Sequence, residues 1–231
     1  MGVQAREVIP EHGSLLQIKG LSVRRQNHDV LHAISLEIHS GERVSIEGAI
    51  GSGKSTLLWA AMGLIERQAG EIQIFSKPCV TEPDFARVRG QIALMFQDPD
   101  DQLIGPTVLE DLEFGPLNLG VDRRQSRDRA RQVLSQLGIE SLAERAVGTL
   151  SGGQKRLVAL AGVMALEPRL LLLDEPTASL DRAAAEGMVE VLASLPCALV
   201  LASHDPLCIE ALSTRRLTLR EGVLGSRSLT G

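Results

Sequence analysis

The order of apolar and polar residues along the chain predicts short strands that alternate with helices. Residues 42–48 (ERVSIEG) alternate in the manner of a strand, and residues 55–65 (STLLWAAMGLI) repeat apolar side chains at helical spacing. The four leucines of 170–173 and the run CALVLASHD at 197–205 are too short for buried helices, so they predict buried strands. This alternation predicts an α/β fold around a core sheet. An antiparallel β part is expected at the N-terminal side, around residues 14–47.

The middle of the chain has a different character. Residues 92–97 begin as a strand that stops at Gln97, and a loop with an Asp-Pro-Asp-Asp stretch and two Gly-Pro pairs follows. Residues 121–139 then place a few apolar side chains among many charges of alternating sign, which is typical of a solvated amphipathic helix. Residues 98–149 are therefore predicted to form a helical insertion.

Length, composition and charge exclude several classes of protein. At 231 residues, the chain fits one domain in which 14–97 and 150–231 form the β part and core and 98–149 is inserted. The longest apolar run, 157–166, is shorter than the roughly 18 residues of a membrane span, and the N-terminal residues lack the order of a signal peptide. A net charge of −5 without a Lys/Arg-rich run argues against nucleic acid as the main ligand. Three cysteines without a CxxC pair predict reduced thiols in the cytosol, and contact with a membrane is expected only through another protein.

The most specific chemistry lies in the stretch GAIGSGKST, which fits the phosphate-binding pattern G-x-x-x-x-G-K-[ST]. Glycines let several backbone N–H groups point at one phosphate, an approach that a β-carbon would block. Lys54 offers a positive charge to the β- and γ-phosphate oxygens, and Ser55 offers its hydroxyl to Mg²⁺. A glycine-rich turn without a ligand is the alternative. The motif predicts an ATP-type P-loop site formed by Gly48, Ala49, Ile50, Gly51, Ser52, Gly53, Lys54, Ser55 and Thr56.

Two acids and a histidine end the buried strands that follow. Asp174 and Glu175 stand at the C-terminal end of the leucine strand, where open α/β sheets place ligand chemistry. Asp174 is predicted to hold Mg²⁺, and Glu175 to polarise the water that attacks the γ-phosphate. A solvated acidic turn is the alternative. His204 ends the next buried strand at the same place and is predicted to contact the γ-phosphate, with a satisfied surface or core histidine as the alternative.

A second anion site is predicted at LSGGQ, where a helix begins with its first N–H groups free to bind an anion. P-loop, Gln97, LSGGQ, Asp-Glu and a late histidine occur in this order, and together they resemble the nucleotide-binding subunits of ATP-binding-cassette (ABC) proteins over residues 16–224. The resemblance implies that two copies, arranged head to tail, bury two ATP between them. It implies a role for Gln97 at the γ-phosphate and Mg²⁺, and for Asp181 in the dimer contact. The residues implied to bind the partner's γ-phosphate are Ser151, Gly152, Gly153 and Gln154.

Residues 96–120 (FQDPDDQLIGPTVLEDLEFGPLNLG) indicate one class within the ABC family. They closely resemble the ATPases of energy-coupling-factor (ECF) importers, which take up vitamins and transition-metal ions such as cobalt and nickel. The resemblance implies a transmembrane coupling protein and a small substrate-binding membrane protein as partners. It also implies a peripheral place on the cytoplasmic face of the membrane. A homodimer is favoured over pairing with a paralogue, because both composite sites look complete.

Three other ABC classes are alternatives to the ECF importers. The ATPase of an ordinary ABC transporter is the main alternative. A chromosome-maintenance or DNA-repair ATPase needs hundreds of coiled-coil residues between its halves, and a translation-type ABC protein needs two cassettes, so both fit poorly.

Two details of this resemblance are open. The family usually places an aromatic residue before the P-loop to stack on adenine, but Arg25 corresponds to it here and the chain has no tyrosine. A guanidinium can stack on a base, and a solvated Arg-Arg turn is the equal alternative.

Residues beyond Gln97 are expected to form a groove for a helix of the membrane partner, or else plain contacts within the insertion. The expected apolar anchors are Leu103, Ile104, Val108, Leu112 and Phe114, and the expected acidic rim is Asp100, Asp101, Glu110 and Asp111.

Overall fold

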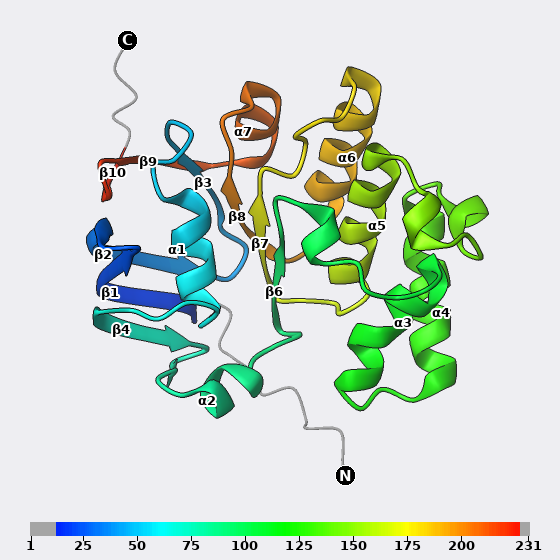
Figure 1. The fold of residues 1–231 in the computed structure, drawn as a ribbon, viewed down its shortest axis with the longest axis horizontal. Coiled ribbons are helices and arrows are strands. Elements are labelled where there is room, and N and C mark those ends of the chain that lie inside the picture. Colours follow the sequence, from blue (N-terminus) through cyan, green and yellow to red (C-terminus); the bar gives the residue numbers. More distant parts are fainter. Residues whose placement is uncertain (1–12, 227–231) are drawn as a thin grey trace.

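A computed structural model describes residues 13–226, and a six-stranded sheet forms their centre (Figure 1). Its strand order is β10-β9-β3-β8-β7-β6. The strands from β9 to β6 run parallel to one another, and β10 is antiparallel to β9. The strands are β3 (Arg43–Glu47), β6 (Ile92–Met95), β7 (Leu170–Asp174), β8 (Ala198–Ala202), β9 (Arg215–Arg220) and β10 (Val223–Ser226).

The leucine strand β7 shows why this sheet is buried on both faces. All of its residues are buried, and alternate leucines enter different hydrophobic cores. Leu170 and Leu172 pack in the core beneath the antiparallel sheet, whereas Leu171 and Leu173 pack in the core beneath the insertion. This alternation is the two-residue period of a strand. In register, Asp174 lies opposite Ala202 of β8, so the carboxyl ends of these strands meet at one edge.

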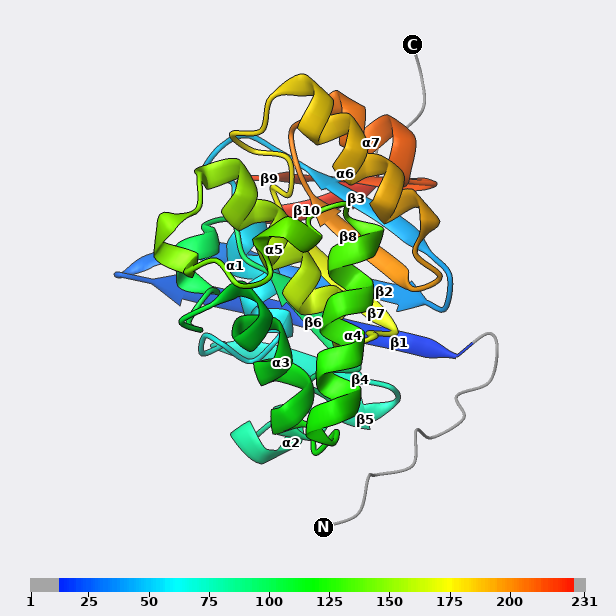
Figure 2. The same ribbon diagram turned by 90° about the vertical axis from the view of Figure 1, so that its right-hand side faces the viewer.

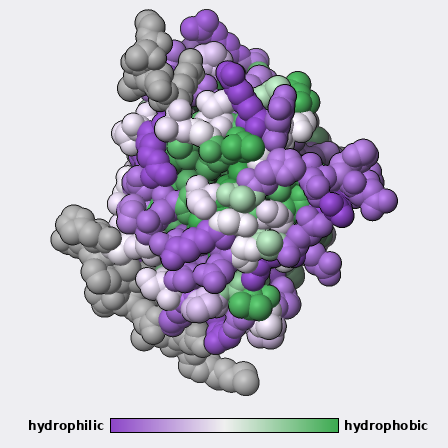
Figure 3. Space-filling view, turned by 90° about the vertical axis from the view of Figure 1, so that its left-hand side faces the viewer, coloured by the Kyte–Doolittle hydropathy of each residue, from purple (hydrophilic) through white to green (hydrophobic). Residues whose placement is uncertain are grey.

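A second sheet, antiparallel, has the order β2-β1-β4-β5. The β1–β2 turn uses Gln26 and Asn27, both at positive φ, as a tight two-residue hairpin requires. Figure 3 shows the side of the molecule that bears this sheet, where apolar residues in the middle are framed by polar ones. The strands are β1 (Ser14–Arg25), β2 (His28–His39), β4 (Ala69–Ile74) and β5 (Lys77–Pro78).

The predicted extent of the antiparallel part, around 14–47, is wrong at its C-terminal end. Strand β3 pairs in parallel with β8 and β9 and belongs to the central sheet. Its residues Val44 and Ile46 are both buried, and so is Ser45 between them, on the opposite face. A strand covered on both faces belongs inside a parallel sheet, and residues 69–78 complete the antiparallel sheet instead.

Helices cover both faces of the central sheet. Helix α1 lies between the two sheets, while α5, α6 and α7 cover the other face. Helices α3 and α4 pack against each other and against α5 at one side of the molecule (Figure 2). The helices are α1 (Lys54–Ala61), α2 (Glu82–Ala86), α3 (Val108–Asn118), α4 (Arg123–Gln136), α5 (Gly152–Met164), α6 (Arg182–Ser194) and α7 (Pro206–Leu212).

The amphipathic helix expected within 121–139 is α4. Asp122 caps it by accepting hydrogen bonds from the backbone N–H groups of Arg124 and Gln125. Its apolar face, with Val133 and Leu134 buried, packs toward α3 and α5, and its arginines remain at the surface. No helix among residues 13–226 combines the length and apolar content that crossing a membrane requires.

Candidate functional site

The P-loop connects β3 to α1 and depends on its glycines for its shape. Gly51 has φ 81° and Gly53, the N-cap of α1, has φ 102°, a region that residues with a β-carbon rarely adopt. A β-carbon on Gly48 would lie 2.5 Å from the carbonyl oxygen of Leu219. The loop therefore curls tightly and leaves the first N–H groups of α1 directed out of the helix.

Lys54 begins α1 and is only 7% exposed. Its Nζ donates to the backbone carbonyls of Gly48 (2.9 Å) and Ala49 (3.3 Å) and lies 3.5 Å from Oε1 of Glu175. The ammonium group thus stands over the P-loop and faces the end of β7. This places a positive charge and a carboxylate side by side in the wall of the cavity where a phosphate would enter.

Glu175 directly follows β7 and holds a left-handed backbone conformation, with φ 47°. Its Oε1 lies 2.9 Å from Nδ1 of His204, and its Oε2 accepts from the Ser203 hydroxyl (3.1 Å) and the His204 backbone N–H (3.3 Å). The side chain is almost fully buried, whereas that of His204 is largely exposed. The carboxylate is therefore oriented by two residues that directly follow β8, and it lies next to the Lys54 ammonium group.

Asp174 is the last residue of β7 and is fully buried. Neither of its carboxylate oxygens has a hydrogen-bond partner of normal geometry among the described residues. Burial raises the pKa of Asp174, the Ser55 hydroxyl opposes that rise, and the Glu175 charge adds to it. A buried carboxylate without partners is costly unless a cation or a donor completes it. The oxygens of Asp174 and Ser55 are the kind that Mg²⁺ prefers.

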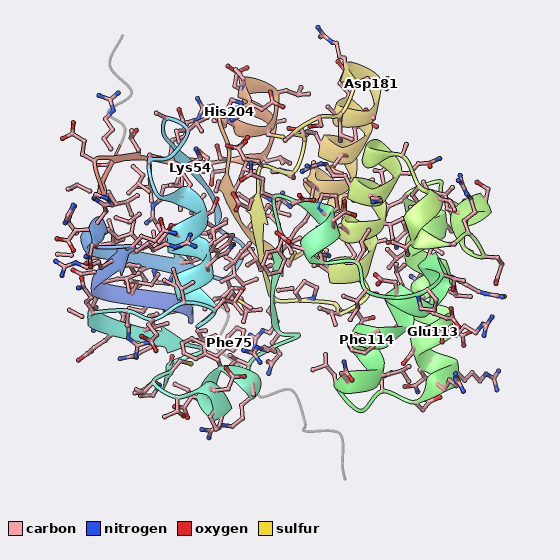
Figure 4. All side chains as sticks on the ribbon, viewed as in Figure 1. Lys54, Phe75, Glu113, Phe114, Asp181 and His204 are labelled. Atoms are coloured by element: carbon pink, nitrogen blue, oxygen red, sulfur yellow. The ribbon has the colours of Figure 1, made fainter. Side chains whose placement is uncertain are left out.

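The predicted site residues Lys54, Ser55, Asp174, Glu175 and His204 come together around one cavity of about 390 Å³. Figure 4 shows Lys54 and His204 at the same edge of the central sheet. Most of the P-loop also lines this cavity, from Ile50 to Thr56, and so does Gln97, which follows β6. The end of each of the strands β3, β6, β7 and β8 thus supplies part of one site.

The structure places Arg25 at the mouth of this cavity together with Trp59, a residue that the sequence reading did not single out. The Arg25 guanidinium carbon lies 5.2 Å from the centroid of the Trp59 ring, a cation–π contact. Arg25 is exposed at the end of β1, and Trp59 is half-buried on α1. The Arg25 side chain is thus exposed and also packs on an aromatic ring, and stacking on adenine stays a prediction.

Arg156 of α5 is a second residue of the site that the sequence did not predict. It is buried, and its two terminal nitrogens donate to the backbone carbonyls of Glu175 and Gln97, each at 2.8 Å. Burial lowers its pKa, and the charges of Asp98, Glu175 and Asp174 raise it. In the sequence, Arg156 looks like one more charge at the start of a helix, so no local signal distinguishes it.

The LSGGQ stretch forms the N-terminus of α5 with a reciprocal capping box. The Ser151 hydroxyl accepts from the Gln154 backbone N–H, and the Gln154 side chain accepts from the Ser151 backbone N–H. None of the four residues 151–154 lines the P-loop cavity of the same chain. Asp181, at the N-terminus of α6, accepts from the backbone N–H of Ala184 and caps that helix.

The groove predicted beyond Gln97 is largely wrong. Leu103, Val108 and Leu112 are buried in the core beneath the insertion, which is the alternative that the sequence left open. Ile104 and Phe114 alone among the expected anchors are exposed, at 67% and 49%. Three of the expected rim acids make local contacts: Asp100 pairs with Lys155, Glu110 accepts from Thr107, and Asp111 accepts from the Ile104 and Gly105 backbone.

The family model described as ABC transporter matches residues 31–178. The chain belongs to the ABC transporter family. An uncharacterized ABC transporter ATP-binding protein of Haemophilus influenzae is 44% identical over 209 residues, which cover 90% of this chain and 96% of that protein. The energy-coupling factor transporter ATP-binding protein EcfA of Methanothermobacter thermautotrophicus is 36% identical over 198 residues, 84% of this chain and 64% of that protein.

Two solved structures are similar to this ABC chain as a whole. CbiO1 of Clostridium perfringens, described as part of the ABC transporter complex CbiONQ, has a TM-score of 0.80 and 32% identity, covering 92% of this chain and 87% of that one. The cassette MJ0796, solved as a dimer bound to ADP and phosphate, has a TM-score of 0.81 and 28% identity, covering 94% and 99%. The predicted P-loop fold of the ABC type is confirmed, and the chain is an ATP-binding and ATP-hydrolysing subunit of a transporter.

Proposed function

We propose that this ABC ATPase drives an importer of the energy-coupling-factor type, which takes up a vitamin or a transition-metal ion through membrane partners. The observation that carries the proposal is the segment 96–120, whose sequence resembles ECF ATPases and which joins the ATP cavity at Gln97 to the insertion. The similarity to EcfA and to CbiO1 supports the same class. The geometry of the ATP site supports the hydrolysis step that any such transporter needs.

For hydrolysis, we assign Glu175 as the general base for the attacking water. Its carboxylate already accepts from Ser203 and His204, so its oxygens are fixed at the cavity wall. His204 contacts this carboxylate and is exposed toward the cavity, where it can donate to the γ-phosphate. Lys54 moves its N–H donors from the loop carbonyls to the β- and γ-phosphate oxygens when ATP binds.

Mg²⁺ fits the residues on the P-loop side of this cavity. The two buried carboxylate oxygens of Asp174 and the Ser55 hydroxyl are the ligands that would hold it, together with Gln97, which lines the same cavity. The described residues contain no cluster of three His, Cys, Asp or Glu that could hold a metal alone. The ion is therefore proposed to bind together with the ATP phosphates, where it would neutralise their charge.

A second subunit is proposed to complete each ATP site with its LSGGQ stretch. Because residues 151–154 do not line the cavity of their own chain, their free helix N-terminus is available to another chain. A β-carbon on Gly152 would meet nothing within 4 Å, so packing inside the chain does not demand a glycine there. Ile50 of the P-loop is 91% exposed beside the cavity, an apolar surface that a second copy would cover. A homodimer with Asp181 at its contact is the arrangement we favour.

The membrane partner is proposed to contact α3 of the insertion and the loop that precedes it. Ile104 and Phe114 expose apolar surface there, and Asp101 is exposed close by. Figure 4 shows Phe114 on α3, on the side of the molecule away from the antiparallel sheet. Exposed apolar side chains together with an exposed acid suit a short helix of a coupling protein. We place the chain on the cytoplasmic face of the membrane through this contact.

The test is affinity purification of the tagged chain from solubilised membranes, followed by identification of the co-purified proteins by mass. The proposal expects two membrane proteins, a coupling protein and a smaller substrate-binding one. Phe114→Lys should lose both, while the purified variant keeps its basal ATPase rate. Val223→Lys is the matched control, since Val223 is equally exposed but lies on β10. Recovery of ordinary permease subunits without a small membrane protein would reject the ECF assignment.

Gln102 is unsuitable for such a test, although it adjoins the same loop. Its side-chain nitrogen donates to the carbonyl of Ala159 on α5 (2.7 Å), and its side-chain oxygen accepts from the Phe96 backbone N–H (3.2 Å). Replacing Gln102 would therefore disturb the connection between β6 and α5 itself. A loss of uptake in that variant would not distinguish a broken interface from a broken loop.

A further inference from the structure

Arg156 joins three motifs of this chain that lie far apart in its sequence. It is 6% exposed, and it follows the LSGGQ stretch on α5 by two residues. One terminal nitrogen donates to the carbonyl of Glu175, 19 residues away, and the other to the carbonyl of Gln97, 59 residues away. Both acceptors are backbone atoms of residues that we place at the γ-phosphate.

The geometry of these bonds fixes the backbone on which Glu175 depends. With φ 47°, Glu175 occupies a conformation that a residue with a β-carbon holds only when its surroundings impose it. Its N–H donates to Ala202 of β8 (2.8 Å), and its carbonyl is held by Arg156. Both sides of the residue are therefore fixed, and the planar guanidinium fork allows little freedom between its two bonds.

Arg156 also places a positive charge beside the carboxylates of the site. Asp174 and Glu175 are adjacent and buried, and their charges repel each other. The charges of Asp98, Glu175 and Asp174 all favour the protonated guanidinium, against the effect of burial. The guanidinium thus sets a fixed positive charge beside these carboxylates.

We infer that Arg156 is a positioning residue for ATP hydrolysis, which transmits the position of the signature helix α5 to Glu175 and to the Gln97 loop. The inference rests on the proposed role of Glu175 as the base. The N-terminus of α5 is the end proposed to meet the nucleotide on the partner's P-loop. When α5 shifts on contact with that nucleotide, the Arg156 guanidinium moves with it and carries the carbonyls of Glu175 and Gln97 along. The nucleotide bound to one chain thereby adjusts the catalytic carboxylate of its partner chain.

Arg156→Met tests this by removing both bonds and the charge while keeping most of the side-chain volume. We expect kcat for ATP to fall about 10- to 100-fold, the scale for a misplaced catalytic group, and KM to change less than threefold. Arg156→Lys keeps the charge but cannot hold both carbonyls through one planar fork, so it should also lower kcat while KM again changes less than threefold.

Arg43→Met is the matched control. The Arg43 guanidinium also donates to backbone carbonyls, those of Leu192, Ala193 and Leu195, but at the end of β3 opposite the P-loop. This variant should lower the melting temperature and leave kcat within twofold of the unmodified chain. If Arg156→Met does not fold, Arg156→Lys decides the question, because wild-type kcat in that variant overturns the inference.

Glu175→Gln is measured in parallel, which separates the two assignments. If Glu175→Gln is inactive and Arg156→Met keeps its kcat within twofold, the inference about Arg156 is wrong. If Glu175→Gln remains active, the base assignment fails instead. Equal loss of kcat in Arg156→Met and Arg43→Met, in step with their melting temperatures, would reduce Arg156 to a purely structural residue and overturn the inference.

Discussion

Arg25→Ala tests how this ATPase holds the adenine base without the usual tyrosine. In the structure, one face of the Arg25 guanidinium packs on Trp59 at 5.2 Å, at the mouth of the P-loop cavity. We propose that the other face stacks on adenine, so that Trp59 holds the guanidinium in place for the base. Cation–π contacts at exposed sites contribute about 0.5–1 kcal/mol. At 1.4 kcal/mol per tenfold, ATP affinity should fall by roughly two- to fivefold.

The assay uses the fact that the chain has one tryptophan and no tyrosine. Trp59 fluorescence therefore reports directly on the ring beneath Arg25 during titration with ATP. Arg25→Tyr should restore ATP binding, because an aromatic ring replaces the guanidinium plane. Inorganic triphosphate, which has no base, should bind Arg25→Ala and the unmodified chain equally well, because the P-loop is untouched.

Arg24→Ala supplies the control for the loss of a positive charge at this hairpin. Arg24 is exposed like its neighbour, but it pairs with Asp29 across the β1–β2 hairpin at 2.6 Å and does not line the cavity. Its removal should leave ATP affinity unchanged. The reasoning is refuted if Arg24→Ala and Arg25→Ala lose affinity equally, or if triphosphate binding to Arg25→Ala weakens as much as ATP binding does.

Three further predictions follow from the same site and core. Glu175→Gln should bind ATP but not hydrolyse it, and should accumulate as an ATP-bound dimer on gel filtration; turnover near the unmodified rate would contradict the base assignment. Ser151→Arg removes a helix cap, so it should lower the free energy of unfolding by about 1 kcal/mol. It should also abolish hydrolysis, yet the monomer should still bind ATP. A monomer that cannot bind ATP would show that LSGGQ belongs to the ATP site of its own chain. Burial raises the pKa of all three thiols, that of Cys208 to about 11, but Cys197 is partly exposed whereas Cys79 and Cys208 are buried. At pH 8 iodoacetamide should therefore label Cys197 first, as intact mass would show; equally fast labelling of Cys208 would show that the core opens.

The sequence alone determined those features that consecutive residues build. The P-loop is one such feature, because its glycines, Lys54 and Ser55 form a cradle from a single short turn between a strand and a helix. The leucine strand β7 is another such feature. Four consecutive apolar residues followed by two acids are typical of a buried parallel strand with carboxylates at its C-terminal end. The amphipathic period of α4 and the cap at Asp122 likewise lie within one stretch of chain.

Only the tertiary structure decided which distant residues meet. For the apolar residues of the 103–114 segment the sequence favours a groove, but packing against α4 and α5 buries Leu103, Val108 and Leu112 and leaves Phe114 exposed. The sequence predicts β3 as a continuation of the N-terminal antiparallel part. In the structure β3 pairs with β8 and β9 in the central sheet, where both of its faces are buried. Arg156 and Trp59 had no local signal at all. Their partners lie tens of residues away, and hydrogen bonds and ring contacts depend on distance in space, which a one-dimensional pattern does not contain.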